Sequence, residues 1–151
     1  MATTVGEIIR TAMRRIGVLS GGEPLSSSDG PDALRVFVQM VDGWSAEPLL
    51  NPLIVDEATG LETMQILSAA LPAGGLTEVV DLPAGYERAL VFNLCIELAD
   101  EWGKEVSRAV AINAGDSKRL IKRNNSRTPI LKVDRGITDR NYDYYDIAAG
   151  V

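Results

Sequence analysis

The chain has 151 residues, 46% of them hydrophobic and 5% aromatic, which fits one compact domain with an aliphatic core and argues against wholesale disorder. It has no histidine and one cysteine, which excludes catalytic triads, histidine-based zinc sites and an internal disulfide. The net charge of -6 is unevenly distributed: residues 1–117 carry 17 acidic and 7 basic side chains, whereas residues 118–140 carry 8 basic and 2 acidic ones. The acidic part should therefore repel nucleic acid, while the basic segment could attract an anion or an acidic surface.

The first predicted helix covers residues 4–16. Its apolar residues recur at the spacing of one helical face: Val5, Ile8, Ile9, Ala12, Met13 and Ile16. Thr4 is a good N-cap residue, and Glu7 stands where its capping-box partner belongs. Gly17 suits the left-handed residue that ends a helix.

A second helix is predicted over residues 31–47, with Ser27, Ser28 or Asp29 as its cap. Its expected buried face consists of Leu34, Phe37, Val38, Val41 and Trp44. We expect this helix to stop before Pro48, because proline cannot continue it.

Residues 48–82 have a different pattern, with short apolar runs bounded by glycine and proline. This pattern predicts a β-like or loop insertion of short strands that includes a hairpin. A helix across residues 57–71 is the alternative interpretation.

Two further helices are predicted over residues 85–103 and 104–125. The first has an apolar face formed by Tyr86, Leu90, Val91, Leu94, Cys95, Leu98 and Trp102. The second has a narrow stripe of mostly small residues, formed by Val106, Ala109, Val110, Asn113, Ala114, Ser117, Leu120 and Ile121. Since small residues allow helices to approach closely, we expect these two helices to pack tightly against each other.

The helical pattern ends at Asn125, and residues 126–151 are predicted to form an extended C-terminal arm. The arm carries adhesive side chains without a periodic apolar partner nearby, which we predict to bind another protein: Ile130, Leu131, Val133, Tyr142, Tyr144, Tyr145 and Ile147. Tyrosine is enriched at interfaces because it offers a large contact area at low entropic cost. The predicted fold is therefore mainly α, a four-helix bundle in residues 1–125 followed by this arm.

No set of residues assembles into a catalytic constellation, so we predict that the protein is not an enzyme and binds no cofactor or metal. Cys95 lies on an apolar helix face and is interpreted as a buried structural thiol. The acidic residues Glu97, Asp100, Glu101 and Glu105 are interpreted as a solvated helix face. A lytic activity through Glu97 or Glu101 is the disfavoured enzymatic alternative.

A basic run, formed by Lys118, Arg119, Lys122 and Arg123, closes the last predicted helix. Cations at this position complement the negative end of the helix dipole. The run is also compatible with an acidic protein partner or with DNA phosphates. All three interpretations remain open from the residues alone.

Two blocks of the chain resemble the head-to-tail adaptor proteins of tailed bacteriophages, the head-completion or packaged-DNA-stabilisation family. The first block is carried by Ile16-Gly17-Val18-Leu19, Gly22-Glu23, Asp32-Ala33-Leu34 and Trp44, and the second by Leu90, Asn93, Leu94, Ala99 and Trp102. The resemblance covers residues 5–46 and 82–125. The segment between the blocks is shorter than in many members of the family.

The resemblance implies a helical protomer that forms a ring of roughly twelve subunits under the portal protein. Such a ring extends the DNA channel, encloses double-stranded DNA without reading its sequence, helps retain the genome and joins a tail or neck component. The implied location is the head-tail junction of a virion, after synthesis in the host cytoplasm. No membrane role is expected, because no stretch approaches the ~18 apolar residues of a membrane-spanning helix and the amino end lacks a signal-peptide core. The alternative is a small helical DNA-binding or regulatory protein that uses the basic run.

Overall fold

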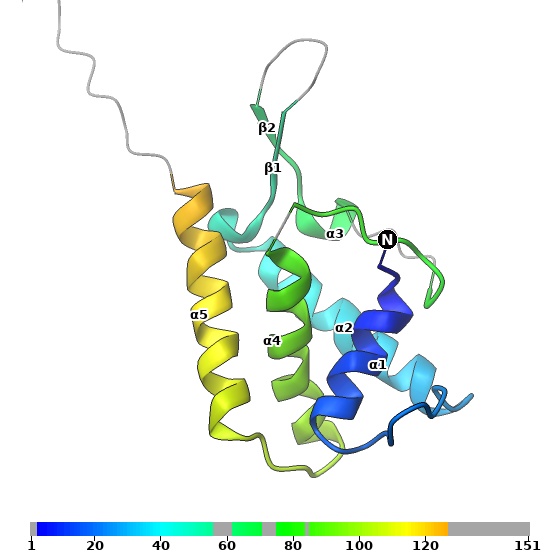
Figure 1. Ribbon diagram of the computed structural model, residues 1–151. Helices are drawn as coiled ribbons and strands as arrows, with labels where there is room; N and C mark the ends of the chain where they lie inside the picture. Colours follow the sequence, from blue (N-terminus) through cyan, green and yellow to red (C-terminus); the bar gives the residue numbers. More distant parts are fainter. Residues whose placement is uncertain (1–2, 56–61, 71–74, 84, 127–151) are drawn as a thin grey trace, which may run out of the picture.

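The computed structural model describes residues 3–55, 62–70, 75–83 and 85–126. Four long helices form a mainly helical bundle, as the sequence predicts: α1 (Val5–Arg15), α2 (Asp29–Ser45), α4 (Tyr86–Glu101) and α5 (Arg108–Asn125) (Figure 1). Helix α4 is the centre of this bundle, because it packs against α1, α2 and α5. None of the described helices combines the length and the apolar character needed to cross a membrane.

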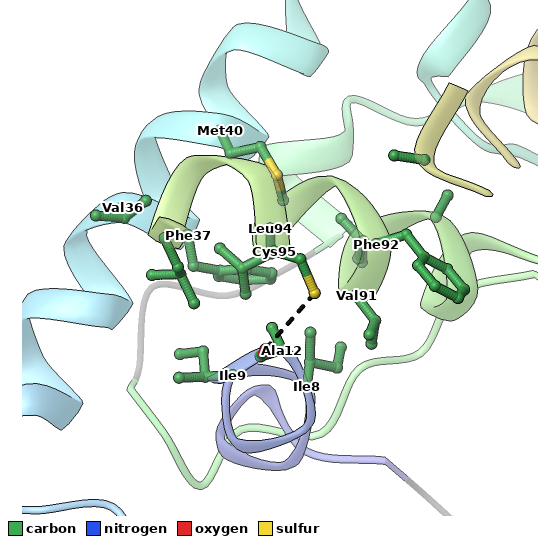
Figure 2. Close-up of a cluster of buried hydrophobic side chains, with 14 of the residues drawn as sticks. Ile8, Ile9, Ala12, Val36, Phe37, Met40, Val91, Phe92, Leu94 and Cys95 are labelled. Carbon is green, nitrogen blue, oxygen red and sulfur yellow. Dashed lines mark hydrogen bonds between the residues drawn. The ribbon is translucent and has the colours of Figure 1, made fainter. Parts of the chain in front are cut away.

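The core is built around α4, whose buried side chains point in most directions around its axis: Tyr86, Ala89, Leu90, Val91, Phe92, Leu94, Cys95, Leu98 and Ala99. Figure 2 shows Ile8, Ile9 and Ala12 of α1 meeting this helix from one side. On another side the cluster is closed by three residues of α2, namely Val36, Phe37 and Met40. A helix that is buried on several sides positions all of its neighbours.

Helix α1 begins and ends as the sequence predicts. The hydroxyl of Thr4 accepts a hydrogen bond from the backbone N–H of Glu7 at 3.3 Å, and the Glu7 carboxylate accepts one from the Thr4 N–H at 3.0 Å. The helix ends before Gly17, which has a left-handed φ of 72°. This reciprocal cap satisfies two backbone donors that the first turn leaves without helical partners.

Helix α2 begins at a predicted cap residue but differs from the prediction in its buried face. Its N-cap residue is Ser28, one of the predicted caps, but the side chain of Ser28 makes no capping hydrogen bond. The hydroxyl of Ser26 instead accepts a hydrogen bond from the N–H of Asp29 at 2.9 Å. Val38, expected to be buried, is 42% exposed. The buried residues of this helix include Ala33, Val36 and Met40, because the contacts with α1 and α4 lie on that side.

The insertion contains the predicted hairpin. A short 3-10 helix, η1 (Pro48–Leu50), leads into β1 (Leu53–Val55), which pairs antiparallel with β2 (Glu62–Met64) and places Leu53 opposite Met64. The alternative helix across residues 57–71 is wrong for the residues that are described, since only α3 (Leu67–Ala70) is helical there. In Figure 1 the hairpin projects away from the bundle, beyond the amino end of α4.

The end of the insertion lies along the start of the chain. Backbone N–H groups of Val5 and Gly6 donate to the carbonyls of Glu78 and Leu76 at 2.9 and 2.8 Å. The N–H of Val80 donates to the carbonyl of Thr3 at 2.8 Å. The backbone N–H groups in the first turn of α1 that lack helical partners therefore bond to a segment at least seventy residues away in sequence.

Helix α5 begins at Arg108 rather than at the predicted residue 104, because Gly103 (φ 59°) ends α4 and Ser107 caps α5 through a 3.3 Å bond from the N–H of Val110. Its buried face consists of Val110, Ala114, Ser117 and Ile121. Two other residues of the predicted stripe, Ala109 and Leu120, are exposed. The close approach to α4 is direct, since the amide of Asn93 donates to the carbonyl of Ala114 at 3.2 Å.

Candidate functional site

The residues of the C-terminal arm that were predicted to bind another protein lie outside the described part of the chain: Ile130, Leu131, Val133, Tyr142, Tyr144, Tyr145 and Ile147. Their proposed contact with another protein therefore stays a prediction. What the structure does describe is the end of the bundle from which this segment continues. There, α5 ends at Asn125 and the last described residue is Ser126.

Asn125 is the centre of a polar network at the hairpin end of the bundle. Its side-chain amide donates to the carbonyls of Leu49 and Asn51 at 2.9 and 3.0 Å and to the hydroxyl of Tyr86 at 2.7 Å. Burial raises the pKa of Tyr86, and the hydrogen bond with Asn125 opposes this shift. The network joins the end of α5, η1 and the start of α4, so it fixes the position of the last turn of α5.

Asn51 extends this network into the core. It is only 5% exposed, and its side-chain oxygen accepts from the N–H of Leu67 at 2.9 Å while its amide donates to the carbonyl of Ser45 at 3.1 Å. The sequence analysis missed both Asn51 and Asn125. The available signal was an asparagine at a helix end and another beside a proline, which is too common a pattern to identify a shared site.

The basic run at the end of α5 is divided between two sides of the helix. The Lys122 ammonium forms an ion pair with Glu47, and the Lys118 ammonium lies 4.9 Å from the centre of the Trp44 ring. The contact with Trp44 fastens α5 to α2, and the ion pair fastens it to Glu47, just beyond the end of α2. These two lysines, which the sequence offered as partner or DNA ligands, therefore have intramolecular roles.

The other two cations of the run point outward. Arg119 pairs with Asp116 at 3.2 Å, one helical turn earlier. Arg123 forms no ion pair with any residue that the structure describes. The four cations consequently do not form one continuous surface for a phosphate backbone, because two of them are held against the bundle.

Cys95 is a buried structural thiol, as the sequence predicts. It is fully buried, and its Sγ donates to the carbonyl of Ala12 at 3.6 Å (Figure 2). Burial raises its pKa to about 11, although the positive charge of Arg15 acts in the opposite direction. Since the thiolate is the reactive form, this thiol is protected from nucleophilic chemistry at neutral pH.

The acidic residues at the end of α4 have different environments. Glu101 pairs with Arg35 at 3.2 Å. Glu97, Asp100 and Glu105 are exposed, and none of them forms an ion pair within the described ranges. No described group of three or more histidine, cysteine, aspartate or glutamate side chains is placed to hold a metal ion.

The sequence analysis also missed a cleft between α1 and α4, with a volume of about 540 Å³. It is lined by Thr11, Arg15, Gly85, Glu87, Arg88, Val91 and Phe92. The guanidinium carbons of Arg15 and Arg88 lie 4.5 and 5.4 Å from the centre of the Phe92 ring. Arg88 also donates to the side-chain oxygen of Asn113 at 2.7 Å, which fixes its direction. We call this feature the arginine cleft.

No protein-family model matches the chain, and no curated protein matches it in sequence. The structure does show where the residues of the adaptor resemblance lie. Most of them are buried or pack on the core: Ile16, Leu19, Ala33, Leu34, Trp44, Leu90, Leu94, Ala99 and Trp102. These residues stabilise the bundle. The resemblance is therefore evidence about the fold rather than about a functional site.

Proposed function

We propose that this chain is a head-to-tail adaptor of a tailed bacteriophage. In this role it forms a ring under the portal protein at the head-tail junction of the virion. The ring extends the DNA channel, helps retain the packaged DNA and offers a platform for a tail component. The proposal combines the resemblance of two sequence blocks with the helical bundle that those blocks build.

One observation carries the proposal furthest. The described hydrophobic core is closed by residues between Val5 and Ile121, while Tyr142, Tyr144 and Tyr145 follow the last helix of that bundle in the sequence. Tyrosine is among the residues enriched at interfaces, so we assign these three rings to contact with another protein. The Asn125 network supports the proposal further, because it fixes where the arm departs from the bundle.

The charge of the bundle is compatible with a channel that DNA must pass through. Residues 1–117 hold 17 acidic and 7 basic side chains, and two of the four cations near the end of α5 contact Glu47 and Trp44 of the same chain. A surface rich in lysine and arginine would attract phosphates and retard the movement of DNA. An acidic surface encloses DNA without binding it.

Truncation of the arm tests the proposal. A variant lacking residues 138–151 should keep the thermal unfolding curve of the full chain and should fail to co-purify with the portal protein of the same phage. A full-length variant with Tyr142, Tyr144 and Tyr145 replaced by serine serves as the matched control for chain length and should lose binding as well. Ring-shaped complexes of the full chain and the portal should be visible by electron microscopy. Undiminished portal binding by both variants would contradict the role of the arm.

The DNA-binding alternative rests on Arg119 and Arg123, the outward-facing cations of the basic run. It expects duplex affinity that falls steeply as salt is added, and loss of this affinity when both arginines are replaced by alanine. A gel-shift measurement at low salt distinguishes the two proposals. Absence of binding there would eliminate the alternative.

A further inference from the structure

Helix α4 carries charges that oppose its own dipole. The amino end of a helix is partly positive and its carboxyl end partly negative, so acids are favoured in the first turn and bases in the last. Arg88 lies in the first turn of α4, where Glu87 alone has the favourable sign, and its last turns contain Glu97, Asp100 and Glu101 without any basic residue. Of these three acids only Glu101 has an ion-pair partner among the described residues, namely Arg35.

The arginine cleft holds positive charge that the described bundle does not neutralise. Arg15 and Arg88 stack on Phe92, and neither forms an ion pair with a described residue. Glu87 lines the same cleft, but its carboxylate accepts a hydrogen bond from the hydroxyl of Thr3 at 3.2 Å. The two arginines outnumber the one carboxylate of the cleft, so a net positive charge remains there for an anionic group of another molecule.

The complementary surface lies where α4 ends and the chain turns into α5. Asp100 and Glu105 are exposed there, and neither forms an ion pair with a residue in the described ranges. Lys104 is the only cation between them in sequence. In Figure 1 this turn forms the end of the bundle opposite the hairpin. We call Asp100 and Glu105 the acidic end.

We infer that a second copy of this chain docks head to tail, with the acidic end of one copy against the arginine cleft of the next. The guanidinium fork matches a carboxylate with two parallel hydrogen bonds, so arginine on one side and aspartate or glutamate on the other is a specific pairing. The contact also relieves the unfavourable charges at both ends of α4. This inference rests on the proposed ring, because it identifies surfaces through which ring subunits meet.

The two surfaces are different parts of one chain, so the contact is heterologous. Each copy that docks leaves one cleft and one acidic end free for further copies, and repetition closes a ring if the rotation between copies allows it. A two-fold dimer would instead use the same surface on both copies. The inference therefore predicts association that continues beyond a dimer.

Charge reversal in the full-length chain tests this inference. One variant carries Arg15→Glu and Arg88→Glu, and the other carries Asp100→Lys and Glu105→Lys. The unmodified chain should associate beyond the dimer at low salt in sedimentation velocity experiments, and each variant alone should sediment as a monomer. An equimolar mixture of the two variants should associate again, because each then meets surfaces of opposite charge. Association of the unmodified chain should weaken as salt rises, since salt screens the pairing.

The matched control reverses two exposed arginines of the same chain, Arg119→Glu and Arg123→Glu, which changes the net charge by as much as the cleft variant does. It should associate like the unmodified chain. Circular dichroism checks that each variant is folded. If the variant with Arg15→Glu and Arg88→Glu unfolds, a variant with Arg15→Gln and Arg88→Gln replaces it. We expect this glutamine variant to associate at least tenfold more weakly than the unmodified chain.

An unmodified chain that stays monomeric at every concentration would overturn the inference. So would variants that associate normally, or a mixture that does not associate. The outcome is separate from the test of the proposed function: loss of portal binding on truncation leaves the head-to-tail contact unaffected, and loss of self-association by the charge variants leaves the portal arm unaffected.

Discussion

The side-chain amide of Asn125 donates to the hydroxyl of Tyr86 at 2.7 Å, which ties the last turn of α5 to the first turn of α4. The same amide also serves the carbonyls of Leu49 and Asn51. The side chain of Asn125 thus connects the end of α5 and the start of α4 to the segment that leads into the hairpin.

Replacing Asn125 by alanine should therefore destabilise the protein. Loss of this donor leaves partly buried acceptors unpaired, and we expect a decrease of about 1–3 kcal/mol in the free energy of unfolding. Urea denaturation measures the change. The matched control is Asn124→Ala, because Asn124 is the exposed neighbour in the same turn. Equal effects of the two substitutions would contradict a structural role for the Asn125 network.

Replacing either of two helical glycines by alanine should change the stability of the protein, but in opposite directions. A Cβ added at Gly6 would lie 2.7 Å from the backbone oxygen of Leu76, which also accepts the hydrogen bond of the Gly6 N–H. At Gly43 an added Cβ meets nothing within 4 Å. Gly43→Ala should stabilise the protein by up to about 1 kcal/mol, since alanine favours helix. Gly6→Ala should destabilise it by about 1–3 kcal/mol through overpacking.

Thermal or urea unfolding measures the stability of the two variants, which carry the same glycine-to-alanine change in two different helices. The comparison separates helix propensity from the contact between α1 and residues 75–80. If both substitutions stabilise the chain, the close approach at Leu76 is not maintained in solution.

The stability should decline at alkaline pH because of Cys95. Its pKa in the folded protein is raised from the ordinary value of 9.0 to about 11, so the folded state retains a proton that the unfolded state has lost within this window. The stabilisation is fully present below pH 9 and is lost as the pH rises through about 11. Tyr86, whose pKa is also raised, acts in the same direction at higher pH.

The measurement is the urea midpoint between pH 8 and pH 11. In a Cys95→Ala variant the midpoint should start lower, because the side chain is truncated in the core, and should fall less steeply with pH. Equal slopes for the two proteins would show that this thiol does not cause the decline.

The ion pair between Lys122 and Glu47 should make a small contribution to the attachment of α5. The two side chains are 34% and 39% exposed, so solvent screens their attraction. A double-mutant cycle with alanine at both positions should give a coupling of about 0.2–1 kcal/mol. Replacing Arg123 with alanine in a parallel cycle with Glu47 is the control and should show no coupling. A coupling energy of zero between Lys122 and Glu47 would contradict the intramolecular role of this lysine and leave it available for a partner.

Local features of the fold could be predicted because their causes lie within a few residues. The capping box of Thr4 and Glu7, the stop at Gly17 and the burial of Cys95 all depend on neighbouring positions or on the pattern of one helix. The predictions failed where a second element decides. Val38 was assigned to the wrong side of α2 because the direction of the core is set by α1 and α4, not by α2 itself.

The candidate surfaces show the same division. The basic run was visible in the sequence, but its separation into inward lysines and outward arginines depends on the positions of Trp44 and Glu47. The arginine cleft was not visible, because Arg15 and Arg88 are 73 positions apart and are brought together by the packing of α1 on α4.

The sequence by itself thus determined the four helices, the capping box of α1, the uneven distribution of charge and the aromatic segment that follows the last helix. It could do so because helical periodicity and capping are short-range properties. Only the tertiary structure decided which charged side chains contact another part of the bundle and which point outward. That choice depends on burial and distance between segments remote in sequence, which fix the electrostatic environment of each group.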